Sequence, residues 1–505
     1  MKIFSRNIMP VMSEMSAMPE TPIQAVRHVL SVRHVLSAML VISMMLAFPA
    51  QIAFSQDLPP APPEIPDTPA WAVYVFLNAD NNLDMAGLDD VKEMERGLKN
   101  AANIPVVVQI DRARTGAKRL LVTEDSSTTL QDLGEVDMGS ADTLIEFLQW
   151  AHENYPARRT MLVIWNHGAG WYEGESRLSS GPRGISYDDT SGNHITTFQL
   201  RKIMDKACTI LGKPLDILGF DACLMNMAEV IWQLGDGVKI CVGSEETEPG
   251  DGWPYNSILS KLCANPEMSP VELSKIIVSK YTGSYWIPLY NVTQSAIDVA
   301  ALKEFRDDFN FWVEAMLGLK DYEKQLFSNA WNNAQRFYYN SYADLFHFAK
   351  LVRKGILPII GNKILREATD RVLSWEDRIV IKSSTGGSSM KNARGLSIHI
   401  DNLPAHSYYR HLAFAQDTLW DEFLTEFTPL PPPPPPEQGL TAAACSSRQY
   451  APDSSIKEMI TELGRRGDSS ALKGLAERVR ALPPRMLEEA GPILELIEQI
   501  RRNLE

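Results

Sequence analysis

The amino-acid sequence predicts an α/β fold in which a mostly parallel β-sheet is covered by helices on both faces. Short apolar runs rich in β-branched and aromatic residues, such as Trp71–Leu77 and Ile104–Asp111, are typical of buried strands. Segments with helical spacing of their apolar residues separate these runs along the chain. Strands that alternate with helices form parallel sheets with both faces covered.

The first predicted strand, Trp71–Leu77, ends at the polar sequence ADNNLD, and MAGLDDVKEMERGLKNA then has helical spacing. Ile104–Asp111 is the second strand, and RLLVTE forms either a hairpin or a third strand. SADTLIEFLQWAHENY predicts an amphipathic helix, because Ser140 is a suitable cap and apolar residues recur on one face.

The next strand, Met161–Trp165, runs directly into the sequence NHG, and a second strand lies in LDILGFDAC. Helical patterns in TTFQLRKIMDKACTIL and NMAEVIWQL lie before and after that second strand, and VKICVGS is a further strand. We interpret residues from about Ser269 to Ala393 as a helical extension packed on the sheet. RGLSIHI, Arg394–Ile400, is interpreted as a late strand that closes the sheet.

Residues 1–55 predict a signal peptide with a long amino-terminal region. Two arginines precede the apolar run Val35–Phe48, which is too short for a comfortable membrane span but suits a signal-peptide core. Small residues at Ala53 and Ser55 predict cleavage near Ser55, and an uncleaved membrane anchor is the alternative. The tandem VRHVLS repeat leaves open a start codon downstream of Met1.

Two proline-rich linkers divide the remainder of the chain. Residues 56–70 and 429–453 are predicted to be extended, and 71–428 forms the main folded domain. Residues 454–505 are charged and helical and resemble one unit of a HEAT-like repeat. A lone helical hairpin is marginal, so this tail is expected to dock elsewhere or to pair with another chain, and its partner is unknown.

The net charge of −14 argues against nucleic acid as a partner, because nucleic-acid binding requires a basic surface. The same charge leaves open a cationic substrate. The five cysteines are scattered, and no pair has the spacing of zinc ligands. A disulfide framework and a structural metal site are therefore not indicated.

Two apolar strands each lead into a reactive side chain, His167 after the first and Cys223 after the second. Neighbouring strands lie about 4.8 Å apart, so residues at the same ends of adjacent strands meet across one cleft. An imidazole there can deprotonate a thiol, which makes it a nucleophile. Gly168 and Gly170 allow a close backbone approach, and their N–H groups can bind an oxyanion.

The alternative for either residue alone is structural, a buried cysteine or a loop histidine. Cys208 lies within a predicted helix and Cys241 within an apolar strand, so both are interpreted as core residues. Only Cys223 occurs at a strand end that matches the position of His167.

Carboxylates lie close to Cys223 in the sequence. Asp221 precedes it by two residues, so in an extended segment both side chains face the same side. The loop SEETEPGDGWPY adds Glu246, Glu248 and Asp251. These acids are suited to an arginine or lysine of a substrate, and solvated surface carboxylates are the alternative.

The sequences ADNNLD, WNHGAGW, FDACLMNMAEV and GSEETEPGDGWPY occur in that order, followed by GLSIHI and TLWDEFL. Together they resemble the clostripain family of cysteine peptidases over about Trp71–Phe427. That family shares a caspase-like sheet with gingipains, legumains and separases, so the resemblance implies a caspase-like fold.

The resemblance also implies a role for each site residue. His167 is then the general base of a His–Cys dyad, and Cys223 is the nucleophile that forms a thioester acyl-enzyme. The N–H groups of Gly168 and Cys223 form the oxyanion hole. Asp221 lies at the floor of the specificity pocket and selects arginine or lysine before the scissile bond, with Asp251 as a second candidate. No third catalytic residue is required.

Members of the family are often activated by self-cleavage between the histidine and the cysteine. The sequence YEGESRLSSGPRG lies in that interval and offers Arg177 and Arg183 as cleavage sites, unless it is an ordinary surface loop. No cofactor is required, although some relatives depend on calcium. DNNLD and SYDDTSGN contain oxygen ligands without the spacing of an EF-hand, so no metal ligands are assigned and calcium binding stays open.

We therefore expect an exported endopeptidase, periplasmic, surface-attached or secreted, that cleaves protein and peptide substrates after arginine or lysine. A catalytically silent protein that uses the same fold to bind peptides or a surface is the first alternative. A hydrolase in which the ADNNLD carboxylates bind a metal is the second.

Overall fold

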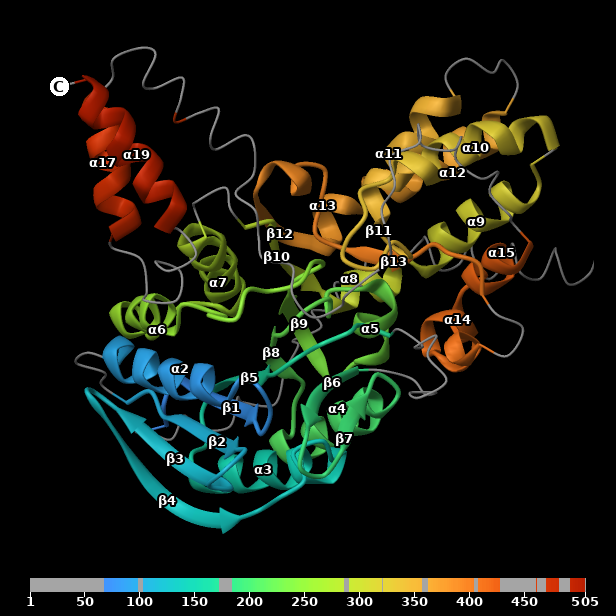
Figure 1. Cartoon of the computed structure of the whole chain (residues 1–505). Coiled ribbons are helices and arrows are strands. Elements are labelled where there is room, and N and C mark those ends of the chain that lie inside the picture. Colours follow the sequence, from blue (N-terminus) through green and yellow to red (C-terminus); the bar gives the residue numbers. More distant parts are fainter. Residues whose placement is uncertain are drawn as a thin grey trace, which may run out of the picture. The chain divides into compact units, whose positions relative to one another are not determined.

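The structure is a computed structural model that describes residues 68–98, 103–171, 184–285, 290–319, 321–356, 362–403, 407–426, 460, 469–480 and 491–504 (Figure 1). The signal-peptide region, most of the first linker and the polyproline linker lie outside these residues. In the described part, the largest sheet has nine strands in the order β12-β10-β9-β8-β5-β1-β2-β3-β4. No helix of the described part is long and apolar enough to cross a membrane.

The centre of this sheet is parallel, as the sequence predicted. Its strands are covered on both faces, so they are almost fully buried. Strands in this position can be apolar throughout. The parallel strands are β1 (Trp71–Ala79), β2 (Val106–Arg112), β5 (Arg159–Trp165), β8 (Leu215–Asp221) and β9 (Val238–Gly243).

Antiparallel pairs extend the sheet at both edges. RLLVTE lies in β3 (Ala117–Thr123), which pairs with β2 and forms a hairpin with β4 (Ser126–Gly134). At the other edge, β10 (Val292–Asp298) pairs with β9 and with β12 (Val380–Gly386). These last two strands lie within the region interpreted as a helical extension, so that interpretation was incomplete.

The prediction that RGLSIHI closes the main sheet was wrong. Its strand, β13 (Ser397–His399), pairs with β11 (Tyr342–Asp344) in a separate two-stranded sheet. Contacts to the α5 region hold it there, since the Ser397 N–H donates to Asn226 O at 3.1 Å and the His399 N–H donates to Glu229 Oε1 at 2.8 Å. Another two-stranded sheet consists of β6 (Gly184–Asp188) and β7 (Asn193–Thr196).

Helices cover both faces of the main sheet, as predicted. Alternate residues of β1 belong to two different apolar clusters, with Tyr74 and Phe76 in one and Val73 and Val75 in the other. The first cluster includes residues of α3 (Ala141–Asn154), α4 (Gln199–Leu211), α5 (Ala228–Gln233) and α8 (Val299–Glu304). The second includes α2 (Asp84–Gly97), α6 (Tyr255–Ala264) and α7 (Pro270–Ser284), and Figure 1 shows α2 beside α6.

The remaining helices follow the alternating part of the chain. An aromatic cluster around Trp312, Phe348 and Trp420 holds several of them together. They are α9 (Arg306–Leu317), α10 (Asp321–Asn333), α11 (Leu345–Ile356), α12 (Lys363–Ser374), α13 (Glu376–Ile379), α14 (Ala413–Asp417) and α15 (Trp420–Glu426), with short 3₁₀ turns at Ser388–Met390 and Tyr408–His411. In the tail, α17 (Ser469–Arg480) and α19 (Gly491–Leu504) pack against each other.

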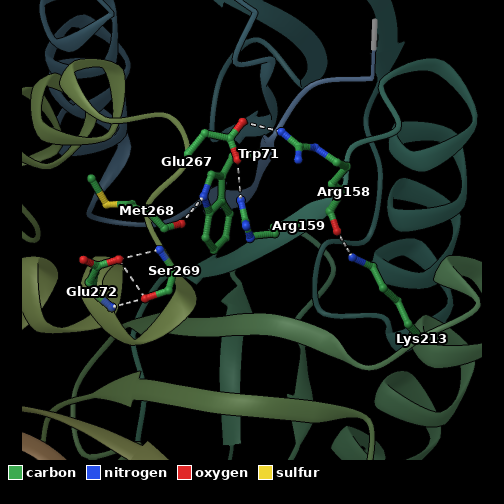
Figure 2. Close-up of polar contacts among 8 residues, drawn as sticks. All are labelled: Trp71, Arg158, Arg159, Lys213, Glu267, Met268, Ser269 and Glu272. Atoms are coloured by element: carbon green, nitrogen blue, oxygen red, sulfur yellow. Dashed lines mark hydrogen bonds and ion pairs between the residues drawn. The ribbon is translucent and has the colours of Figure 1, made fainter. Parts of the chain in front are cut away.

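A polar network fixes the amino-terminal ends of the central strands (Figure 2). The Trp71 indole N–H donates to the carbonyl oxygen of Met268 at 3.0 Å. Glu267 pairs with both Arg158 and Arg159. Since β1 and β5 begin at these residues, the network fixes where both strands start and therefore which residues reach their carboxyl ends.

Candidate active site

His167 and Cys223 follow strands β5 and β8 at equivalent positions. Trp165 and Asp221 are register partners in the parallel pair, and the Asn166 N–H donates to Asp221 O at 3.2 Å. A β-carbon added at Gly168 would lie only 2.4 Å from the carbonyl oxygen of Cys223. The two loops therefore touch through their backbones immediately beside the predicted base and nucleophile, an approach that only glycine permits.

The imidazole of His167 is half-buried, and its Nε2 lies 2.7 Å from Asn82 Oδ1. Since an amide oxygen only accepts, this contact assigns the proton to Nε2 and leaves Nδ1 as a free base. Burial lowers the pKa of His167, an effect that the charge of Asp189 opposes. The ring is thus largely neutral at pH 7 and can accept a proton.

Asn82 was not among the predicted site residues. It belongs to ADNNLD, the polar sequence that follows β1, and β1 is the neighbour of β5 in the sheet. The position of ADNNLD directly after a predicted strand indicates that its side chains lie at a strand end. Only the order of the strands in the sheet shows that this end lies beside His167.

The thiol of Cys223 is half-buried under the loop that follows β9. Its Sγ accepts a hydrogen bond from the Glu248 N–H at 3.2 Å and lies 3.8 Å from the Glu248 carbonyl oxygen. Burial raises the pKa of Cys223 to about 11, and the charges of Glu246 and Asp221 act in the same direction. At neutral pH the thiol is protonated, so it requires a base to become a nucleophile.

The residue after Cys223 has a strained backbone. Leu224 has a φ of 64°, which is costly for a residue with a branched side chain. Its N–H donates to Glu246 O at 3.1 Å, which ties this turn to the loop that covers the thiol.

The Gly168 N–H has no hydrogen-bond acceptor among the described residues. The neighbouring Ala169 N–H donates to Gly184 O at 3.0 Å. Gly170 has a φ of 64°, and this left-handed turn follows directly.

Asp221 is buried, and three groups act on its carboxylate. The Tyr255 hydroxyl donates to Oδ2 at 2.8 Å, and the Trp253 N–H donates to the same oxygen at 3.2 Å. The carboxyl of Glu248 acts electrostatically on the same carboxylate. Burial raises the pKa of Asp221 to about 6 despite these bonds, and that of Glu248 well above its usual range. Of this pair, Glu248 has the pKa that is raised further, so Asp221 loses its proton more readily.

The acidic residues of the loop after β9 are less exposed than solvated surface carboxylates would be. Glu246 is buried, while Glu248 and Asp251 are half-buried. Asp251 lies near Tyr285, because its charge raises the pKa of that tyrosine after the larger effect of burial. Arg177 and Arg183, the predicted processing residues, lie outside the described residues.

One group of described carboxylates has the geometry of a metal site. It consists of Asp80, Glu135 and Asp188, with one oxygen from each within 4.8 Å of the others. The predicted oxygen-rich sequences DNNLD and SYDDTSGN thus come together with Glu135, since the first begins with Asp80 and the second contains Asp188. These oxygens suit a hard cation such as Ca²⁺.

A sheet with a parallel centre, which brings a histidine and a cysteine to adjacent carboxyl ends, is the architecture of caspase-like cysteine peptidases. The chain belongs to the clostripain family (peptidase C11), whose sequence profile matches residues 75–427. The family and fold predicted from the sequence are thereby confirmed. Peptidases of this family need no cofactor, and calcium is an optional addition.

Clostripain from Hathewaya histolytica is 28% identical over 233 residues, which cover 38% of this chain and 42% of that protein. The chain thus spans less than half the length of this curated relative. A secreted C11 cysteine protease from Bacteroides thetaiotaomicron, solved with an irreversible peptide inhibitor, has 21% identity and a TM-score of 0.54, over 70% of this chain and 100% of that chain. An inactive zymogen C11 protease from Parabacteroides distasonis has 19% identity and a TM-score of 0.53, over 70% and 98%. These two structures show the shared fold.

Proposed function

We propose that the protein is a cysteine endopeptidase that cleaves after arginine or lysine, with His167 as base and Cys223 as nucleophile. The observation that carries the proposal is the backbone contact between Gly168 and Cys223 at the ends of paired strands. This contact holds the imidazole-bearing and thiol-bearing loops together at the edge of the sheet where parallel folds bind ligands.

The protonation states of the free enzyme favour general-base catalysis. The Cys223 thiol is protonated and the His167 imidazole is neutral at pH 7, by the pKa shifts above. Nδ1 of His167 takes the thiol proton as Sγ attacks the carbonyl carbon of the scissile bond. The same proton passes to the leaving amine, the thioester remains on Cys223, and water then releases the acid product.

The oxyanion of the tetrahedral intermediate would be bound by the N–H groups of Gly168 and Cys223. Two preorganised donors at this position stabilise charge that develops only in the transition state. Substrate binding would also exchange the contacts between Sγ and Glu248 for contacts with the reacting carbonyl.

The carboxylate of Asp221 supplies the basic specificity. It lies two residues before Cys223 and is buried, and at a pH above its raised pKa of about 6 its negative charge would strongly attract a guanidinium or ammonium. The half-buried Asp251 would add to that attraction from the neighbouring loop.

Two further steps complete the proposal. Cleavage of the chain after Arg177 or Arg183 would separate the segment with His167 from the segment with Cys223. Export through the predicted signal peptide would bring the enzyme to its substrates, in line with the secreted relative from Bacteroides thetaiotaomicron.

The test uses a chromogenic arginyl substrate and three purified proteins. Wild type and Cys208→Ala should hydrolyse it equally, because Cys208 lies near the end of helix α4, at the amino-terminal rather than the carboxyl ends of β8 and β9. Cys223→Ala should be inactive, and a peptidyl arginyl ketone should label Cys223 in the wild type by mass spectrometry. Equal hydrolysis by wild type and Cys223→Ala, or no hydrolysis and no labelling in wild type, would refute the proposal.

Mass spectrometry of the intact proteins tests processing and export together. Wild type should show a cut after Arg177 or Arg183 that is absent from Cys223→Ala, and the exported protein should begin near Gln56. An uncut wild type that is fully active would remove the processing step alone.

A further inference from the structure

We infer that Asp80, Glu135 and Asp188 form a binding site for a hard divalent cation, Ca²⁺, next to the loops that hold His167. The three residues come from separate parts of the chain, after β1, after β4 and at the end of β6. One oxygen from each lies within 4.8 Å of the other two. Two oxygens bound to one Ca²⁺ at about 2.4 Å can be at most about 4.8 Å apart, so one ion can contact all three.

Buried oxygens without partners are the second observation. Asp80 is 1% exposed, and its Oδ1 has no hydrogen-bond partner in the structure. The adjacent Asp111 is 0% exposed, and its Oδ2 is likewise unpaired. A buried carboxylate oxygen without a partner is costly, and bound metal is one of the few groups that satisfies it.

The other oxygens of the group are already held in place. The Thr190 N–H donates to Asp80 Oδ2 at 3.1 Å, and the N–H groups of Met138 and Ser191 donate to the two oxygens of Asp188 at 2.9 and 2.8 Å. These bonds fix the orientation of the carboxylates, as hydrogen bonds to the ligands do in metal sites.

Among the described residues, the three carboxylates have no cationic partner. Within the part of the chain that the structure describes, none of the three ligands forms an ion pair with lysine or arginine. A divalent cation at the centre would supply the positive charge that these carboxylates lack.

The donor set identifies the kind of cation. It consists of carboxylate oxygens without sulfur or imidazole, which suits Ca²⁺ or Mg²⁺ rather than a transition metal. Glu135 is exposed, so it can adjust and leaves room for water ligands. Such an adaptable site favours Ca²⁺ over Mg²⁺, which demands near-octahedral geometry.

The site lies beside the proposed base. Asp80 is two residues before Asn82, whose Oδ1 contacts His167, and Asp188 directly precedes Asp189, whose charge acts on the same imidazole. The Asp189 N–H donates to the carbonyl oxygen of Asp80 at 2.9 Å. A cation would therefore fix both loops at once, and this consequence rests on the proposed role of His167.

Calorimetric titration of CaCl₂ into the chelator-treated full chain tests the site, with Cys223→Ala in every sample to prevent self-cleavage. We expect one Ca²⁺ per chain. Glu135→Gln, an exposed substitution that should fold normally, should weaken binding at least about 10-fold, and Asp188→Asn should abolish it. Asp142→Asn, which removes an exposed acid on α3, should bind Ca²⁺ like the parent.

No heat of binding up to millimolar CaCl₂, or equal affinity in the parent and Glu135→Gln, would overturn the inference. Tighter binding of MgCl₂ than of CaCl₂ would overturn the choice of cation. Because the samples are inactive by design, these results are independent of whether the protein is a peptidase.

Discussion

Buried carboxylates lie on both sides of the proposed dyad, and they differ in their hydrogen-bond partners. Beside Cys223, the carboxylate of Asp221 receives hydrogen bonds from the Tyr255 hydroxyl and the Trp253 N–H. Beside His167, Asp80 keeps an unpaired oxygen, and neighbouring carboxylates repel one another. Protein donors satisfy the carboxylate of Asp221, whereas Oδ1 of Asp80 has no partner, although three backbone N–H groups bind other oxygens of its group.

The difference indicates what each group would bind. A pocket that is stable when empty can accept and release a substrate cation repeatedly, as turnover requires. A group that is poorly satisfied when empty favours an ion that stays bound. On this basis, we propose that the group beside Cys223 selects the substrate and that the group beside His167 stabilises the fold. Four sets of substitutions or treatments test this distinction.

The largest effect is expected from Asp221→Asn, which removes the charge of the Cys223 side. The value of kcat/KM for arginyl substrates should fall about 100-fold or more, because the substrate cation loses its buried partner. Steady-state kinetics checks this at saturating Ca²⁺, with Asp205→Asn on the exposed face of α4 as the control. An unchanged preference for arginine over neutral residues in Asp221→Asn would place the specificity pocket elsewhere.

Asn82→Ala tests the link between the two sides. Loss of the contact with Nε2 should lower kcat about 10-fold with little change in KM, because the ring loses its orientation. Asn82→Asp keeps an acceptor and adds a negative charge, which raises the pKa of His167. Its activity should recover in part, with the acid limb of the pH profile moved to higher pH. A purely structural role would instead lower the melting temperature and leave the pH profile of both variants unchanged.

Variants of Glu248 test how the charge of Asp221 on the Cys223 side depends on pH. The pKa of Asp221 is raised to about 6, so its charge is lost as the pH falls through that value, and kcat/KM for basic substrates should fall with it. The side chain of Glu248 opposes the increase. Glu248→Ala removes this effect and should reduce activity about 3-fold at pH 6 with little change at pH 8. Glu248→Gln keeps a polar group there, so its pH profile should follow wild type.

The smallest effect is expected from chelation, on the His167 side. Removal of Ca²⁺ should lower the melting temperature of Cys223→Ala by roughly 2–5 °C, since an ion present at 100 times its Kd stabilises the folded state by about 2.7 kcal/mol. Differential scanning calorimetry measures this change. The same protein with Glu135→Gln should show a much smaller shift, and equal shifts in both would indicate that another site binds the ion.

The sequence predicted the residues that end β5 and β8 because both strands are continuous apolar runs with a reactive side chain directly after them. It did not predict Asn82, because its contact with His167 depends on β1 lying beside β5. Strands β10 and β12 were missed since VTQSAID and VIKSSTG are too polar to stand out, although the first is almost fully buried. RGLSIHI was assigned to the wrong sheet because its partners are the backbone of Asn226 and the side chain of Glu229, which no local pattern shows.

The sheet topology has a consequence for how a nicked form of this protein would behave. β5 and β8 lie side by side in the middle of the sheet, yet the interval between Trp171 and Gly184 separates them along the chain. Both polypeptides released by a break in that interval would contribute strands to one continuous ladder. Two bands on a denaturing gel would therefore elute as a single species under native conditions, without any covalent bond between them.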